Sequence, residues 1–213
     1  MKKQRHSSIF STKYSVLVII ALLFCYLIFF LNTQYFNKPL IKSDYEFYIQ
    51  TDSSYDDVKN HIDSVCGELH FVAKLGMSFF LKQKRLEYWF EPGRYILKES
   101  SSLNDVINKL RSQSQDPINF TFNSMDNISP LFGIADQKLE LDSIELVEYL
   151  DSVHISLDSL YFLLIPNTYQ MFWNTSAKEF VDRIYFEYNS FWNPDRLDAA
   201  NRLQLSKQEI FVL

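Results

Sequence analysis

The side chains best suited to chemistry gather in one stretch, residues 164–173, with the sequence LIPNTYQMFW. Asn167 and Thr168 offer an amide and a hydroxyl directly after a proline, and Tyr169 and Trp173 follow. Aromatic rings combine an apolar face with a polar edge or handle, and sugar-binding clefts pair such rings with amides and hydroxyls. We therefore predict that Asn167, Thr168, Tyr169 and Trp173 bind a sugar. The alternative is that the rings are core, where aromatic side chains are often found.

Pro166 predicts where the backbone turns within this stretch. Proline fixes its own φ and keeps the residue before it extended, so Ile165-Pro166 should end a strand and begin a turn. Asn167 and Thr168 can then bond to their own backbone or point outward.

Several other chemistries are excluded by residue type and spacing. The four glycines are too scattered for a phosphate-binding loop, and the four histidines and two cysteines show no metal-ligand spacing. No carboxylate stands out as a general acid. The net charge of −5 argues against binding to nucleic acid. We expect no cofactor, no metal and no nucleic-acid partner.

The N-terminus has the pattern of a membrane anchor. Residues 14–31 carry no charge, and 13 of these 18 residues are Val, Leu, Ile or Phe. At 1.5 Å per residue a helix of this length spans roughly 27 Å, close to the thickness of a bilayer core. Basic residues precede the run, so we predict a cytoplasmic tail over 1–13, a single transmembrane helix over 14–31 and a periplasmic remainder. The predicted location is the inner membrane.

After a linker over 32–43, the chain repeats itself. Tyr48-Ile49 is echoed by Tyr95-Ile96, and Asp57-Val58 by Asp105-Val106, at shifts of 47 and 48 residues. Each copy predicts a short strand, a serine N-cap and a helix. With a helix over 69–81 between the copies, residues 44–122 predict a β-α-α-β domain that resembles the LysM module, which binds N-acetylglucosamine polymers. A purely structural spacer is the alternative.

Helices dominate the prediction for the remainder. Residues 123–136 predict a loop, whereas capping-box patterns open helices at Asp142, Ser176 and Ser206. Only four apolar residues follow the third box, fewer than a stable helix needs. We therefore expect that the chain is cut inside a helix.

Several short runs, read together, point to a family. They are, in chain order, 91–95 (EPGRY), 104–112 (NDVINKLRS), 118–122 (INFTF), 165–169 (IPNTY), 173–177 (WNTSA) and 191–193 (FWN). With the basic N-terminus and single span, they resemble the YceG-like endolytic murein transglycosylases, in the forms seen in Bacteroidota. Many members have Glu-Gly and Pro-Asp-Thr-Tyr where this chain has Leu163-Leu164 and Asn167, so no role of that glutamate or aspartate is carried over.

The resemblance implies an α+β protein: a single N-terminal transmembrane helix, the LysM-like region, and over 123–213 the start of a mostly helical catalytic domain that is cut off. The implied enzyme cleaves glycan strands without water. A glutamate protonates the leaving oxygen, and the sugar's own 6-hydroxyl closes on C1 to give a 1,6-anhydro end. The stretch that precedes this glutamate in the family corresponds here to residues 203–210, so the resemblance places the catalytic glutamate beyond Leu213. Glu209 is the nearest carboxylate, and helix capping explains it better.

The implied partners are peptidoglycan glycan strands, the inner membrane and cell-wall synthesis proteins. One alternative is a non-enzymatic, membrane-anchored peptidoglycan-binding or division-associated protein. Another is a lyase of folate synthesis, an older label of the family, which an exported domain without a cofactor loop does not support.

Overall fold

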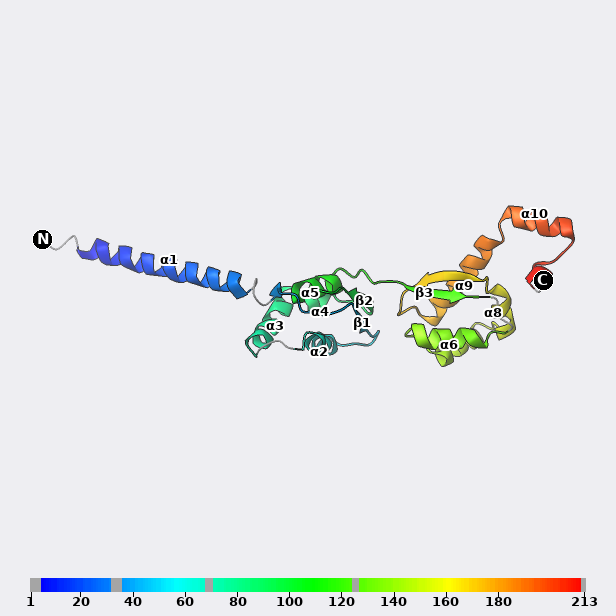
Figure 1. The fold of residues 1–213 in the computed structure, drawn as a ribbon, viewed down its shortest axis with the longest axis horizontal. Coiled ribbons are helices and arrows are strands. Elements are labelled where there is room, and N and C mark those ends of the chain that lie inside the picture. Colours follow the sequence, from blue (N-terminus) through cyan, green and yellow to red (C-terminus); the bar gives the residue numbers. More distant parts are fainter. Residues whose placement is uncertain (1–4, 32–35, 68–70, 124–126, 212–213) are drawn as a thin grey trace. The chain divides into compact units, whose positions relative to one another are not determined.

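The computed structural model describes residues 5–31, 36–67, 71–123 and 127–211, and the chain divides into two compact units (Figure 1). Eleven helices and four strands form within these residues, so the fold is α+β. The first unit comprises 1–46, 54–90 and 96–114, and the second comprises 47–53, 91–95 and 115–213.

The prediction of a transmembrane anchor over 14–31 is wrong. Among the helices of the described residues, none is both long and apolar enough to cross a membrane. The apolar run lies within a longer helix, α1 (Arg5–Leu31), whose sequence also includes Arg5, His6 and Lys13.

The helices of the two repeat copies belong to the first unit, and each begins with the same set of capping hydrogen bonds. Ser54 caps α2 (Tyr55–Val65) and Ser102 caps α5 (Leu103–Arg111), each in a reciprocal box with the aspartate three residues on. The serine backbone N–H donates to that aspartate at 2.9 Å in both copies. These boxes satisfy backbone donors that a helix start leaves free. The predicted repeat is thus confirmed at a spacing of 48 residues.

The connection between the two copies differs from the prediction. β1 (Tyr45–Ile49) and β2 (Gly93–Leu97) form a two-stranded sheet, and both strands are shared between the two units. Three helices connect them: α2, α3 (Phe71–Gln83) and the short α4 (Leu86–Trp89). The order is therefore β-α-α-α-β and departs from the β-α-α-β pattern on which the likeness to LysM modules was based.

The second unit is built on a second two-stranded sheet. β3 (Ile118–Phe122) pairs antiparallel with β4 (Asn167–Met171) in a register that places Phe120 opposite Tyr169. One face of this sheet is buried, and α6 packs against β3, while α7 and α8 each pack against α9. The helices are α6 (Ser129–Lys138), α7 (Ser143–Ser152), α8 (Leu157–Leu163), α9 (Ala177–Phe191), α10 (Pro194–Leu203) and α11 (Lys207–Phe211).

Two local predictions in this unit are wrong. The segment predicted as a loop over 123–136 includes most of α6, which has a proline in its first turn, where the missing N–H costs nothing. The residues before Ile165-Pro166 form α8 and not a strand, because Leu160 and its neighbours bury one side of a helix that Ser156 caps. The strand begins after the proline.

Candidate functional site

The turn at Pro166 is fastened by a tyrosine. α8 ends at Leu163 with Leu164 as its C-cap, Pro166 follows, and β4 begins at Asn167. The Tyr169 hydroxyl donates a hydrogen bond of 2.6 Å to the carbonyl of Ile165, which lies outside the helix and outside the strand. Tyr169 is fully buried, with its ring edge-on to Phe122 at 5.1 Å. The structure thus places Tyr169 in the core, behind the turn that presents its neighbours.

The same arrangement occurs at a second proline. Tyr95 is also fully buried, and its hydroxyl donates to the carbonyl of Glu91 at 2.9 Å, across Pro92. Burial raises the pKa of both tyrosines to about 12, with nearby carboxylates adding to the effect. Each run of five residues therefore reads X-Pro-x-x-Tyr and forms one closed corner before a strand.

Asn167 and Thr168 lie on the solvent side of this corner. Both side chains are exposed, and the Asn167 Oδ1 accepts a hydrogen bond of 2.8 Å from the Thr168 backbone N–H. The Thr168 hydroxyl is 3.0 Å from the hydroxyl of Thr121, its register partner on β3. Asn119 and Gln170 form the next exposed pair along the sheet. This face presents uncharged donors and acceptors, which suit the hydroxyl and acetamido groups of a glycan.

Trp173 lies beyond the opposite end of β4. Its ring is half-buried and rests against Tyr48 at a centroid distance of 4.9 Å. Its carbonyl accepts from the Glu140 backbone N–H at 2.8 Å, and the Glu140 carboxylate accepts two hydrogen bonds from Thr51. About 13 Å of strand separates Asn167 from Met171, and Trp173 comes two residues later. The four predicted residues therefore do not converge on one cavity.

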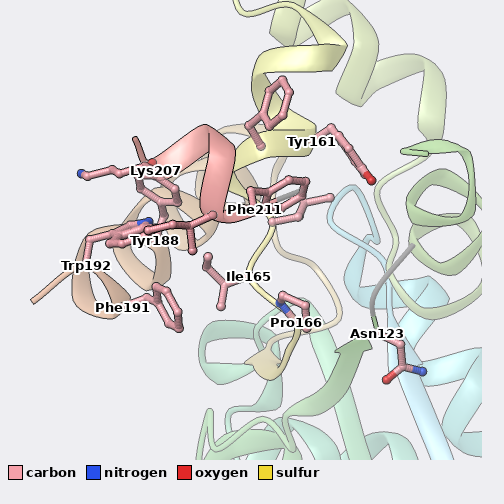
Figure 2. A pocket seen from close by; sticks show the side chains of 12 residues that line it. Asn123, Tyr161, Ile165, Pro166, Tyr188, Phe191, Trp192, Lys207 and Phe211 are labelled. Atoms are coloured by element: carbon pink, nitrogen blue, oxygen red, sulfur yellow. The ribbon is translucent and has the colours of Figure 1, made fainter. Parts of the chain in front are cut away.

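A cavity does lie on the other side of Pro166, and sequence reasoning missed it. Figure 2 shows this aromatic pocket, of about 270 Å³, between α8, the end of α9 and α11. Six of its lining residues carry aromatic rings. The described lining residues are Asn123, Tyr161, Phe162, Leu164, Ile165, Pro166, Tyr188, Phe191, Trp192, Lys207, Ile210 and Phe211.

The wall contributed by α11 is fixed by two kinds of contact. Phe211 meets Tyr161 and Phe162 edge-on, at centroid distances of 5.1 and 5.4 Å. Ser206 and Glu209 form a capping box, in which the Ser206 N–H donates to the Glu209 carboxylate at 2.7 Å. Hydrogen bonds from Ser206 lower the pKa of Glu209. The capping role predicted for Glu209 is confirmed, and a carboxyl so held is poorly suited to donate a proton.

The polar groups of the aromatic pocket are mainly donors. Lys207 holds its ammonium 5.3 Å from the centre of the Tyr188 ring and 5.6 Å from that of Trp192. The Trp192 side chain is more than nine-tenths buried. Among the described residues, its indole N–H makes no hydrogen bond of acceptable geometry. Burial raises the pKa of Tyr188, and the nearby indole N–H of Trp192 partly offsets this rise. None of the described residues that line the pocket is a carboxylate.

A second hollow of about 290 Å³ adjoins the aromatic pocket. The two share the lining residues Phe162, Tyr188 and Lys207. It is more polar and includes Asp158, Ser159 and Gln208. Asp158 is exposed, unlike the buried carboxyl groups that serve as general acids in glycosidases. Within the described part of the chain, no group of three or more His, Cys, Asp or Glu side chains could hold a metal ion.

Some residues that line the aromatic pocket belong to sequence patterns that indicated other roles. Phe191 and Trp192 contributed only to the family resemblance, and Lys207 stood inside a capping-box pattern. Their convergence depends on how α9 and α11 fold against α8, which no local pattern specifies.

One comparison with known proteins, a match to a family model, agrees with the resemblance noted in the sequence. A family model described as the YceG-like family matches residues 47–213. No curated protein is significantly similar to the chain. Among solved structures, a crystal structure of a yceG-like protein from Listeria monocytogenes aligns with 14% sequence identity and a TM-score of 0.32. The alignment covers 78% of this chain and 60% of the Listeria chain.

Proposed function

Because the chain belongs to the YceG-like family, we propose that it binds peptidoglycan glycan strands and belongs to an endolytic murein transglycosylase. The reaction implied by the family resemblance is cleavage without water, which leaves 1,6-anhydro-N-acetylmuramyl ends. Its site of action is then the periplasm, where the glycan strands lie, and its partners there include cell-wall synthesis proteins.

The observation that carries this proposal is the aromatic pocket beside Pro166. Six aromatic rings line a pocket next to an exposed amide and hydroxyl, Asn167 and Thr168. Ring faces pack against the apolar faces of sugars, while amides and hydroxyls bond to their polar edges. Glycan binding therefore requires no change in the described fold.

The same pocket supports a division of roles within the reaction. Transglycosylation needs a proton donor at the leaving oxygen. Glu209 is engaged in capping and Asp158 is exposed, so neither has the surroundings of such a donor. We assign substrate binding and positioning to the described residues and expect the acid to lie outside them.

A second candidate function follows from the same fact. A chain that binds glycan without a proton donor would act as a peptidoglycan-binding protein and not as an enzyme. The two candidates make different predictions for one measurement, which is the release of anhydro ends.

The test uses the 213-residue chain and purified murein sacculi. The chain is kept in mild detergent, since apolar side chains of α1 are exposed. We expect it to co-sediment with sacculi and to release no 1,6-anhydro muropeptides detectable by mass spectrometry. Failure to co-sediment would contradict the proposed binding. Anhydro ends above a buffer blank would show that a residue of this 213-residue chain supplies the acid.

A further inference from the structure

We propose that the aromatic pocket is a subsite for a carboxylate carried on an apolar group. The inference rests on the proposed function and narrows the ligand from glycan in general to the acidic parts of peptidoglycan. Three observations support it: the sign of the charge in the pocket, a buried donor that makes no hydrogen bond of acceptable geometry with the described residues, and the place of Lys207 relative to that donor.

The charge in the aromatic pocket has one sign. Lys207 is the single charged side chain among its described lining residues. The chain as a whole is acidic, with 26 Asp and Glu against 21 Lys and Arg, so a pocket without carboxylates departs from its average surface. An anion that enters meets a cation and no carboxylate among the described lining residues, while Asp158 lies in the adjoining hollow.

The buried donor is the indole N–H of Trp192. Indole nitrogen can only donate, and it usually finds an acceptor when it is buried. Trp192 is 8% exposed, and among the described residues its N–H makes no hydrogen bond of acceptable geometry, although its closeness to the Tyr188 hydroxyl partly offsets the rise in the pKa of that tyrosine. Because the ring lines the pocket, a ligand that brings an acceptor there would complete its hydrogen bonding.

Lys207 and Trp192 can act on the same ligand group. The ammonium lies 5.6 Å from the centre of the Trp192 ring, and Figure 2 shows both residues with Tyr188 at one end of the pocket. The capping box of Ser206 and Glu209 fixes the turn that carries Lys207. A carboxylate, with two oxygens, can accept from the indole N–H and face the ammonium at once.

The rest of the pocket defines what the carboxylate is attached to. Phe191, Ile165 and Phe211 supply an apolar lining with a volume of about 270 Å³, too small for a strand of several sugars. A short apolar group fits such a space. In peptidoglycan two groups have this chemistry: the free lactyl ether of a muramyl residue without its peptide, and the C-terminal D-alanine of a stem peptide.

The experiment compares acids with neutral analogues by isothermal titration calorimetry on the 213-residue chain. One arm titrates a peptide-free GlcNAc-MurNAc tetrasaccharide, its lactyl methyl ester and chitotetraose. The other titrates acetyl-D-Ala-D-Ala and its C-terminal amide. We expect one of the acids to bind about tenfold more tightly than its neutral analogue, as a charge-assisted hydrogen bond would give. The arm in which this occurs identifies the source of the carboxylate.

Variants assign the effect to the proposed residues. Lys207→Met should abolish the preference for the acid, and Lys207→Arg should retain it. Trp192→Phe keeps an aromatic ring and removes the N–H, so it should reduce the preference while saccharide binding persists. Lys178→Met is the matched control, because Lys178 lies on α9 with Asp182 as its partner and does not line the pocket.

Two results would overturn the inference, and they differ in what else they contradict. Equal binding of acid and neutral analogue in both arms rejects the carboxylate subsite but leaves the proposed function standing. Absence of binding by every saccharide rejects the proposed function, and absence of binding in both arms rejects the subsite as well. Melting temperatures of all variants verify that the compared proteins are folded.

Discussion

The hydroxyl of Tyr169 donates to the carbonyl of Ile165 across Pro166, at 2.6 Å. Proline keeps the preceding residue extended, and that residue's carbonyl is then free of helix and strand pairing. A buried carbonyl without a donor is unfavourable, so the tyrosine four residues on supplies one. Tyr95 and Glu91 repeat the arrangement across Pro92. The tyrosine of the Pro-Asn-Thr-Tyr run therefore shapes the backbone, and the exposed Asn167 and Thr168 remain available for a ligand.

Alkaline pH should destabilise the fold through these two tyrosines. Their folded pKa values of about 12 exceed the ordinary value of 10.0, because burial disfavours the charged form. The stabilisation is complete below pH 10 and is lost as the pH rises from 10 to 12. At pH 11 we expect a loss of about 1 kcal/mol per tyrosine in the free energy of unfolding, measured with urea. Tyr169→Phe should remove the part of this pH dependence that is due to Tyr169. If stability depends on pH as it does in the parent protein, the role given to Tyr169 is contradicted.

Truncation should distinguish Tyr169 from Trp173. Tyr169→Ala opens a cavity in the core and should cost about 3–5 kcal/mol of stability. Tyr169→Phe removes only the hydrogen bond to Ile165 and should cost about 1 kcal/mol. Trp173 is half-buried, so Trp173→Ala should cost less than Tyr169→Ala. Melting temperature and sacculus binding are measured on the same samples. A larger loss at Trp173 would reverse the roles given to the two rings.

Thr168 should affect glycan binding more than stability. Thr168→Val removes one hydroxyl and its contact with Thr121. Thr121→Val removes the same contact from the other strand, so the two variants should have equal stability, within about 0.5 kcal/mol. Binding to chitotetraose should weaken only in Thr168→Val. If both variants bind as the parent does, the prediction that Thr168 contacts sugar is refuted.

The cap of α11 should control the wall of the aromatic pocket. Ser206→Ala removes the acceptor for the Glu209 N–H and should destabilise this helix by about 1 kcal/mol. Hydrogen exchange of residues 207–211 should become faster, and saccharide binding should weaken with it. Ser176→Ala deletes the equivalent serine on α9, which carries buried core residues, and should lower the overall melting temperature instead. Unchanged exchange in Ser206→Ala would show that packing of Phe211 alone holds the wall.

Local patterns in the sequence predicted local structure well. Ser176 and Ser206 form the capping boxes that their spacing to a glutamate indicated, and Ser54 and Ser102 cap the helices for which a serine N-cap was predicted. Such bonds span three residues, so the sequence alone contains both partners. The outward position of Asn167 and Thr168 is consistent with the same local rules, whereas β4 begins where a turn was predicted.

Features that depend on contacts between distant residues were harder to predict from the sequence. Residues 160–164 form a short apolar run that fits either a strand or a buried helix, and the structure shows that most of it belongs to α8. Tyr169 stands among residue types that are typical of a sugar-binding site. Its place in the core, however, depends on Phe122 from another strand. Trp192 and Lys207 come together only because α9 and α11 fold onto α8.

The corner closed by Tyr169 bears on how genetic data for this protein should be interpreted. A cell that carries Tyr169→Ala would lose the protein before its chemistry could be examined, because a deficit of several kcal/mol greatly raises the unfolded fraction that proteases clear. A null phenotype at this codon therefore reports abundance and not catalysis. Immunoblots of the mutant strain separate the two, and alleles at Asn167 or Thr168 are better probes of the proposed function.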